Sequence, residues 1–188
     1  MKTNRTLSAF IVALLIVSSA MAQEERRAGP QIPCPHPIVL NIKAPPPSPP
    51  TLDPADFAGA VGAAAAGSVW NQTQPNKSFG HSFHFPHPGR ECCLMTKGTL
   101  IVWVKALQTG KPGSASSAND WVELIHNGQS IPGTGQQPFA GGATAGQTGM
   151  VTINVPASIL ATGTVSLYVQ DDTAVTMAEL RLEGCCLK

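Results

Sequence analysis

Hydrophobic and polar side chains alternate along several short stretches of the chain with a period of two residues. This period is typical of β-strands, because successive side chains of a strand point to opposite faces. In one stretch Val165, Leu167 and Val169 alternate with Ser166 and Gln170, which predicts a strand with one buried face. Stretch 99–106 is apolar on both faces, as in a covered sheet. The predicted strands are 79–85, 99–106, 121–126, 151–155, 165–170 and 178–183.

Turn-forming residues separate these strands. Asn127-Gly128 follows the strand 121–126 and favours a type I′ hairpin turn, because both residues tolerate positive φ. Residues 132–149 hold six glycines and no period, which predicts a long, mobile surface loop. Six or seven strands at this spacing predict an all-β fold, an antiparallel β-sandwich, over residues 69–188.

Residues 1–22 have the layout of a secretory signal peptide. Lys2 and Arg5 precede the apolar run 7–17, and Ala20-Met21-Ala22 is a small-x-small cleavage site. The apolar run is too short for a comfortable membrane span. We therefore expect a secreted protein, extracellular or periplasmic, with no membrane segment after cleavage.

Residues 23–56 are expected to form a proline-rich extended segment. Ten of the seventeen prolines lie between residues 28 and 56, and proline fixes φ and removes a backbone donor. Residues 44–50 predict a semi-rigid polyproline II spacer. Only 37–43, PIVLNIK, has strand character. It either adds to a sheet edge, in its own domain or a neighbour's, or is an apolar patch in a disordered tail.

Residues 57–68 are rich in alanine and glycine. The alanines favour helix, whereas each glycine costs about 1 kcal/mol relative to alanine. The segment is either a linker or a short helix with Asp56 as its N-cap.

The charge of the chain restricts its partners. Without residues 1–22, ten basic residues stand against eleven acidic ones. No basic surface for nucleic acid is indicated. We expect partners among secreted or cell-surface proteins or glycans, with self-assembly included.

Four of the five cysteines mark the limits of the predicted cross-linked region. Cys92-Cys93 precede the strand 99–106 and Cys185-Cys186 follow the strand 178–183. An oxidising compartment favours disulfides, and adjacent cysteines rarely bond to each other. We expect two cross-links between these pairs, which would staple the first and last strands together. Cys34 pairs with one of the four or reaches a second molecule.

Residues 119–183 resemble the galactose-binding-like jelly rolls that occur as accessory domains of secreted proteins. The resemblance covers about half of the chain after residue 22. It implies a jelly-roll sandwich, a sheet rim that binds sugars and a calcium ion that braces the fold. It assigns no binding residue, and the cysteine framework is not a general feature of that family. The residues that carry the resemblance are Asn119-Asp120-Trp121, Asn127-Gly128, 151–155, 163–170 and 178–183.

A metal site is a further candidate. His81, His84 and His87 recur at every third residue, with Cys92-Cys93 shortly after, and imidazole and thiolate suit zinc or copper. In a regular strand His84 would point away from the other two, so a bent loop would have to gather them. The alternative is that these histidines are exposed or pack in the core.

Trp121 is the best surface candidate for stacking on a sugar ring, whereas Trp103 is expected in the core. Asn119 and Asp120 precede Trp121 and complete a candidate ligand site. With the Asp171-Asp172 turn they are also candidate calcium ligands, although adjacent aspartates at a turn are more often capping residues.

The sequence does not favour an enzyme. The paired carboxylates Asp171-Asp172 and Glu179/Glu183 could act as general acid and base only in a pocket that the sequence does not show. The chain has no Gly-x-Ser-x-Gly elbow, no His-Glu-x-x-His and no glycine-rich phosphate loop. Two sequons, Asn71-Gln-Thr and Asn76-Lys-Ser, are glycan acceptors only in a host that modifies them.

The leading hypothesis is a secreted, non-enzymatic β-sandwich that acts in extracellular binding or assembly. A carbohydrate-binding accessory module and an extracellular zinc- or copper-binding protein are the alternatives.

Overall fold

The computed structural model describes residues 34, 36–44, 49–86, 93–114, 120–170 and 172–186. The predicted signal peptide 1–22 lies outside these residues, and the compact unit begins at Cys34. No helix in the described part of the chain is long and apolar enough to cross a membrane. The strands are β1 His36–Ala44, β2 Phe79–His84, β3 Cys93–Ala106, β4 Trp121–His126, β5 Gln129–Ser130, β6 Thr148–Asn154, β7 Thr164–Gln170 and β8 Thr173–Cys186. The helices are α2 Gly59–Ala65 and α5 Ala157–Leu160.

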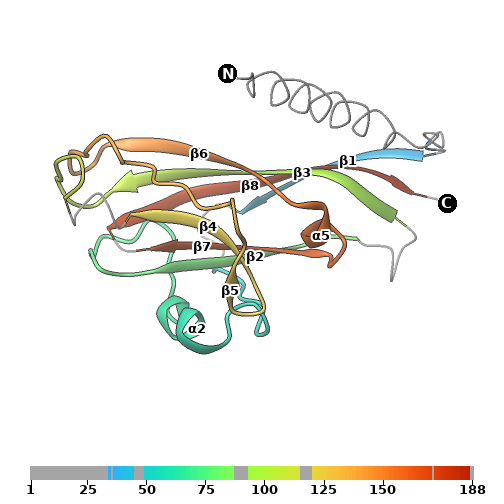
Figure 1. The fold of residues 1–188 in the computed structure, drawn as a ribbon, viewed down its shortest axis with the longest axis horizontal. Helices are drawn as coiled ribbons and strands as arrows, with labels where there is room; N and C mark the ends of the chain where they lie inside the picture. The colour runs from blue at the N-terminus through green and yellow to red at the C-terminus, as the bar shows by residue number, and fades with distance from the viewer. Residues whose placement is uncertain are drawn as a thin grey trace, which may run out of the picture. The chain divides into compact units, whose positions relative to one another are not determined.

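The strands form two four-stranded antiparallel sheets that stack as two layers (Figure 1). Sheet A has the order β1-β8-β3-β6, and sheet B has the order β2-β7-β4-β5. Every neighbouring pair is antiparallel. This is the strand order of a jelly roll, in which paired strands fold over into two Greek keys. The prediction of an all-β antiparallel sandwich is confirmed.

The main core lies between the two sheets. It is built by the alternate residues that face inward, as the two-residue period predicts. Fully buried members include Phe79 and Phe83 from β2, Leu100 from β3, Leu167 from β7 and Leu180 from β8. Each of these strands thus buries the apolar face that it turns toward the opposite sheet.

A second, smaller core lies on the outer face of sheet B. Here α2 and the residues before it cover the sheet (Figure 1). Phe57 and Ala65 pack against Ile125 of β4 and Tyr168 of β7. Gly80 of β2 makes this contact possible, because a Cβ on it would lie 2.4 Å from the ring of Phe57. The short helix, one of the two alternatives for 57–68, is therefore the observed one.

The amino-terminal strand β1 belongs to the sandwich. All nine of its residues pair with β8, from His36 opposite Cys186 to Ala44 opposite Ala178. The sandwich therefore begins well before residue 69. Within the proline-rich segment 23–56, residues 36–44 form an edge strand of the domain itself, which is one of the alternatives considered for 37–43. The physical reason is the alternation of Ile38, Leu40 and Ile42, which pack against the main core.

Two disulfides bond Cys34, which precedes β1, and Cys93, at the start of β3, to the last two residues of β8. Cys93 bonds Cys186, which it faces directly across the β3-β8 ladder. This staple between β3 and the last strand confirms one of the two predicted cross-links. Cys34 bonds Cys185, so Cys185 is not joined to the 92–93 pair.

Strand register explains why the second predicted cross-link does not form. In an antiparallel pair, each step to a higher residue number on one strand is a step to a lower residue number on the facing strand. Because Cys93 faces Cys186, the residue that faces Cys185 is Leu94. Cys185 bonds instead at its other side, where β1 begins. Cys92 lies outside the described residues.

The long loop 132–149 is irregular but well packed. Phe139 is buried in the main core, and the hydroxyl of buried Thr134 accepts the N–H of Leu124. Isolated bridges join Gly110 to Ala143 and Val122 to Gln136. The irregular structure of the loop was predicted, but its packing against the main core and its hydrogen bonds to β4 were not.

Candidate functional site

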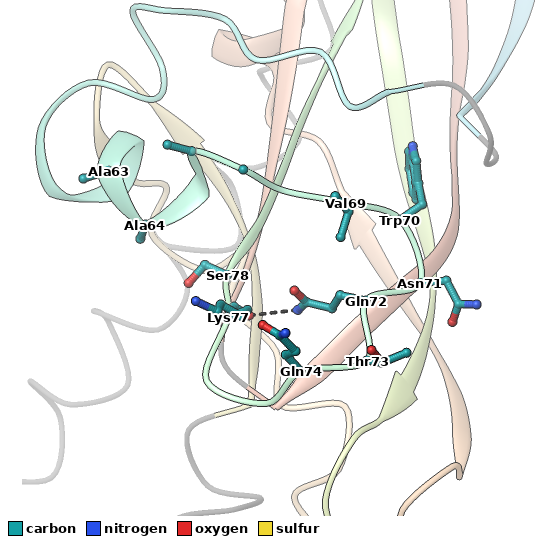
Figure 2. Close-up of a pocket in the computed structure, with 12 residues that line it drawn as sticks. Ala63, Ala64, Val69, Trp70, Asn71, Gln72, Thr73, Gln74, Lys77 and Ser78 are labelled. Atoms are coloured by element: carbon teal, nitrogen blue, oxygen red, sulfur yellow. Dashed lines mark hydrogen bonds between the residues drawn. The ribbon is translucent and has the colours of Figure 1, made fainter.

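A hollow of about 610 Å³ opens between the end of α2 and the segment that leads into β2. We call it the α2 hollow. Figure 2 shows Gln72, Gln74 and Lys77 close together, with Ala63 and Ala64 of α2 on another side of the view. The described residues that line it are Ala63, Ala64, Ala66, Gly67, Val69, Trp70, Asn71, Gln72, Thr73, Gln74, Lys77 and Ser78.

The wall 69–78 is held in place by hydrogen bonds to β8 and within itself. The N–H of Asn71 donates to the carbonyl of Val175 at 2.8 Å. The amide of Gln72 donates to the carbonyl of Lys77 at 2.9 Å and to that of Thr173 at 3.4 Å. Asn71 and Asn76 adopt positive φ, which asparagine tolerates better than most residues. The wall is therefore a fixed turn structure that is anchored to the sandwich.

The opposite wall is positioned by the small core under α2. The helix packs on sheet B through Ala65, which leaves Ala63, Ala64 and Ala66 exposed toward the hollow. Gly67 has φ +93°, so the chain turns sharply out of the helix. The hydroxyl of Ser68 accepts the N–H of Gly80 at 2.8 Å and fixes this turn against β2.

The lining is polar and carries one positive charge. Amides, hydroxyls and the ammonium of Lys77 face small aliphatic side chains, and none of the described lining residues has a carboxylate or an imidazole. The lining residue Asn71 is itself bound by a second ammonium, since Lys105 Nζ donates to Asn71 Oδ1 at 2.7 Å. Ser78 Oγ lies 3.2 Å from the hydroxyl of Tyr168. Such a site can bind through hydrogen bonds but offers no general acid–base pair.

Two of the predicted metal ligands, His81 and His84, do not come together. His81 is buried, its Nδ1 accepts the N–H of Thr51 at 3.1 Å, and its ring lies between Trp70 and Phe83. His84 is exposed and bonds Thr164. Their three-residue separation puts the two on opposite faces of β2. His87 lies outside the described residues, among which no group of three or more His, Cys, Asp or Glu side chains could hold a metal ion.

The environment of His81 keeps its imidazole neutral. Burial, followed by the charge of His84, lowers the pKa of His81 from 6.5 to about 4. The aromatic neighbours Trp70 and Phe83, with ring centroids at 5.4 and 4.7 Å, exclude water from the ring. His81 is therefore a packing residue that also binds the backbone of the segment before α2.

The predicted ligand site around Trp121 is not an open platform. Asp120 is buried, and its Oδ1 accepts the N–H of Asp172 at 3.2 Å. The half-buried indole of Trp121 packs on Gly135, and its Nε1 donates to Glu123 at 3.0 Å. Asn119 lies outside the described residues. Trp121 is thus engaged within the fold and is not part of the α2 hollow.

Two of the three aspartates considered for calcium, Asp120 and Asp172, lie together. Asp120 contacts Asp172, whose Oδ1 accepts the N–H of Asn76 at 3.0 Å and the amide of Gln108 at 3.2 Å. These bonds are those of a buried turn that joins the loop 69–78 to sheet A. Asp171 lies outside the described residues.

Asp56, Ser166 and His126 bring together the residue types of a hydrolase triad, but in the wrong order. Asp56 Oδ1 lies 2.9 Å from His126 Nδ1, and Ser166 Oγ donates to Asp56 Oδ2 at 2.6 Å. In a triad the imidazole contacts the serine hydroxyl and takes its proton, whereas here the serine hydroxyl donates its hydrogen bond to the carboxylate. The cluster fastens the segment before α2 to sheet B. Asp56 is therefore not the predicted N-cap, a position held by Ala58 without a side-chain bond.

No protein-family model matches the chain, and no curated protein matches it either. The α2 hollow itself was missed in the sequence. A signal was present in residues 71–78, NQTQPNKS, a run that is polar apart from Pro75, lies between Trp70 and Phe79 and also carries both sequons. From the sequence, the alanines that complete the hollow were interpreted only as residues that favour a helix.

Proposed function

We propose that this chain is a secreted, non-enzymatic binding protein of the galactose-binding-like jelly-roll type, and that the α2 hollow holds a saccharide unit of its ligand. The observation that carries this proposal is the composition of the hollow. Amides and hydroxyls on a fixed wall suit a ligand that is itself rich in hydroxyls, because each amide can donate and accept.

The absence of a catalytic pair supports binding over turnover. Glycoside hydrolysis uses two carboxyl groups that flank the scissile bond. The described lining of the α2 hollow has none, and Lys77 is its only side chain that is charged at neutral pH. The Asp56–Ser166–His126 cluster is built for anchoring.

The compartment is supported by two independent features. Two disulfides close the described unit, and disulfides persist in oxidising environments outside the cytosol. The sequence 1–22 has the layout of a signal peptide. Secretion is accordingly part of the proposal.

A glycan array tests this function. The purified, oxidised protein is expected to bind a subset of glycans, and comparing neutral with acidic sugars shows whether Lys77 contributes charge recognition. In the double variant Gln74→Ala/Lys77→Ala, whose side chains are exposed, affinity should fall about tenfold or more because two hydrogen-bonding groups are lost. Trp121→Ala and the distant surface variant Lys97→Ala should bind like the wild type.

Two results would contradict the site or the function. Loss of binding in Trp121→Ala with full binding in Gln74→Ala/Lys77→Ala would move the site to the β4 rim. A folded protein that binds no glycan on a broad array would remove saccharide binding as its function.

A further inference from the structure

The strand β1 is the one long edge of the described sandwich that has no cover. A jelly roll has four edge strands, here β1, β6, β2 and β5. β5 has only two residues. On β2 the N–H of Ser82 donates to the carbonyl of Thr51, and on β6 the carbonyl of Thr152 accepts the amide of Gln136. Among the described residues, no such bond reaches β1 from the side opposite β8.

The usual protections of an edge strand are also missing from the centre of β1. Natural edges are blunted by bulges, prolines, inward charges or short length. β1 has nine residues, pairs with β8 without a register shift, and reads IVLNI over residues 38–42. Pro37 and Lys43 lie only at its two ends. Its central backbone is therefore a flat template for another strand.

The main core is open along the same edge. Ile38, Leu40 and Ile42 face the core but are only half-buried, whereas Leu180 and Leu182, opposite Ile42 and Leu40 on β8, are fully buried. On the outer face Val39 is 69% exposed. A strand added beside β1 would remove apolar surface from water on both faces of sheet A, which is favourable.

We propose that the added strand is β1 of a second copy of this chain, in an antiparallel pair about a two-fold axis at Leu40. The two copies of sheet A then form one continuous sheet. This inference does not depend on ligand binding in the α2 hollow.

The sequence of β1 is self-complementary under this symmetry. Ile38 falls opposite Ile42 of the second copy, and Leu40 falls opposite its own equivalent, so the three core-facing side chains meet apolar partners. On the outer face Val39 falls opposite Asn41 of the second copy. Lys43 falls opposite Pro37, so the two lysines do not meet. Each Lys43 also has an acidic neighbour in its own chain, Glu179, at 4.0 Å.

β1 is held ready for such pairing. The Cys34–Cys185 disulfide ties the start of the strand to β8, and the ladder continues to Ala44. Because the strand is already ordered, pairing does not have to offset the entropy of fixing it. A two-fold pairing of this kind is closed, so it produces a dimer and not a fibre.

Sedimentation of the oxidised full chain over a concentration series tests the proposal. The wild type should show twice the monomer mass at high concentration. Val39→Lys/Asn41→Lys should reduce the mass twofold, because it places four like charges beside the axis. Val39→Lys/Asn41→Glu should restore the dimer, because position 39 faces position 41 of the second copy. Met150→Lys, at a residue of similar exposure on β6, should remain dimeric.

Circular dichroism and thermal melting confirm that each variant is folded before its mass is compared. A wild type that stays monomeric throughout the series overturns the proposal, and so does a dimer that persists in folded Val39→Lys/Asn41→Lys. A dimer that is lost equally in both double variants also overturns it, since the pairing of 39 with 41 would then be wrong.

Discussion

Single polar residues fasten the segment 51–57 onto sheet B. Asp56 is 2% exposed and accepts hydrogen bonds from the hydroxyl of Ser166 and the N–H of Asn127, besides its contact with His126. His81 binds the N–H of Thr51 in the same way. A buried polar group is costly without partners, so these pairs define one position for the segment 51–57.

Asp56→Ala is expected to destabilise the protein by about 3 kcal/mol, because it removes several charge-assisted hydrogen bonds and leaves buried donors unpaired. Asp56→Asn should cost less, since an amide oxygen can replace one acceptor. Urea denaturation measures both. Asp53→Ala, at a more exposed turn position that accepts the N–H of Ala55, is the matched control and should cost about 1 kcal/mol or less. Equal costs for Asp53→Ala and Asp56→Ala would show that the network adds no stability.

His81 should make the protein less stable in acid. Its pKa is lowered to about 4 in the folded protein, against 6.5 ordinarily, so the unfolded chain binds the proton more readily. Stability from this group is therefore complete above about pH 6.5 and is lost as the pH falls toward 4, by on the order of 2–3 kcal/mol.

His81→Phe keeps an aromatic ring between Trp70 and Phe83 but cannot be protonated. It should be less stable than the wild type at neutral pH, because the N–H of Thr51 loses its acceptor. The free energy of unfolding of the variant should change less between pH 7 and pH 4.5 than that of the wild type. Parallel pH profiles for the two proteins would show that His81 does not titrate in this range.

At the scale of elements, α2 forms through packing more than through its own sequence. It has seven residues, two of them glycine, no side-chain cap and no charged residue in its first or last turn. Isolated helices of this length are unstable in water. The contacts of Ala65 and Phe57 with Ile125 and Tyr168 therefore hold it, and with it one wall of the α2 hollow.

Gly80→Ala tests this dependence. The new Cβ would lie 2.4 Å from the ring of Phe57 and 2.9 Å from the Cβ of Ala65, so α2 must shift. We expect a loss of about 1–3 kcal/mol and faster amide exchange in 59–67. Gly141→Ala, where a Cβ meets nothing within 4 Å, should leave both unchanged. Unaltered exchange in folded Gly80→Ala would show that α2 does not rest on β2.

At the scale of the whole molecule, β8 is the strand on which the domain depends. It pairs with β1 on one side and with β3 on the other, and it supplies one cysteine to each of the two disulfides. The cross-linked cysteines are 151 and 93 residues apart in sequence. Cross-links over such long loops chiefly restrict the unfolded chain.

Cys93→Ser/Cys186→Ser is therefore expected to destabilise the protein by about 4 kcal/mol on the chain-entropy model. Cys34→Ser/Cys185→Ser should also destabilise it, and it should in addition loosen β1, seen as faster amide exchange in 36–44. Urea denaturation without reductant measures the two costs, and the wild type with reductant is the control. A cost near zero for Cys93→Ser/Cys186→Ser would contradict the pairing of Cys93 with Cys186.

The sequence by itself determined the secondary structure of most strands and the fold class. Alternation in segments such as 165–170 is a local property and correctly predicts a strand. The prediction that only one face of this strand is buried was wrong, because Ser166 and Tyr168 on its other face are buried as well. The Asn127-Gly128 turn is equally local, and Asn127 indeed has positive φ. The position of the cysteines at the ends of strands predicted a cross-link between the pairs 92–93 and 185–186, and the structure shows that Cys93 and Cys186 form it.

Only the tertiary structure decided which segments become neighbours. Register, which no local pattern contains, placed Leu94 opposite Cys185 and left that cysteine for Cys34. Trp103, expected in the core, instead lies on the outer face of sheet A beside Met150 and Met177, because its neighbours Val102 and Val104 face inward. The α2 hollow exists because chain folding brings alanines of 63–66 to the polar run 71–78. A site of this kind is formed by segments that are brought together by folding, so the pattern of either segment alone does not reveal it.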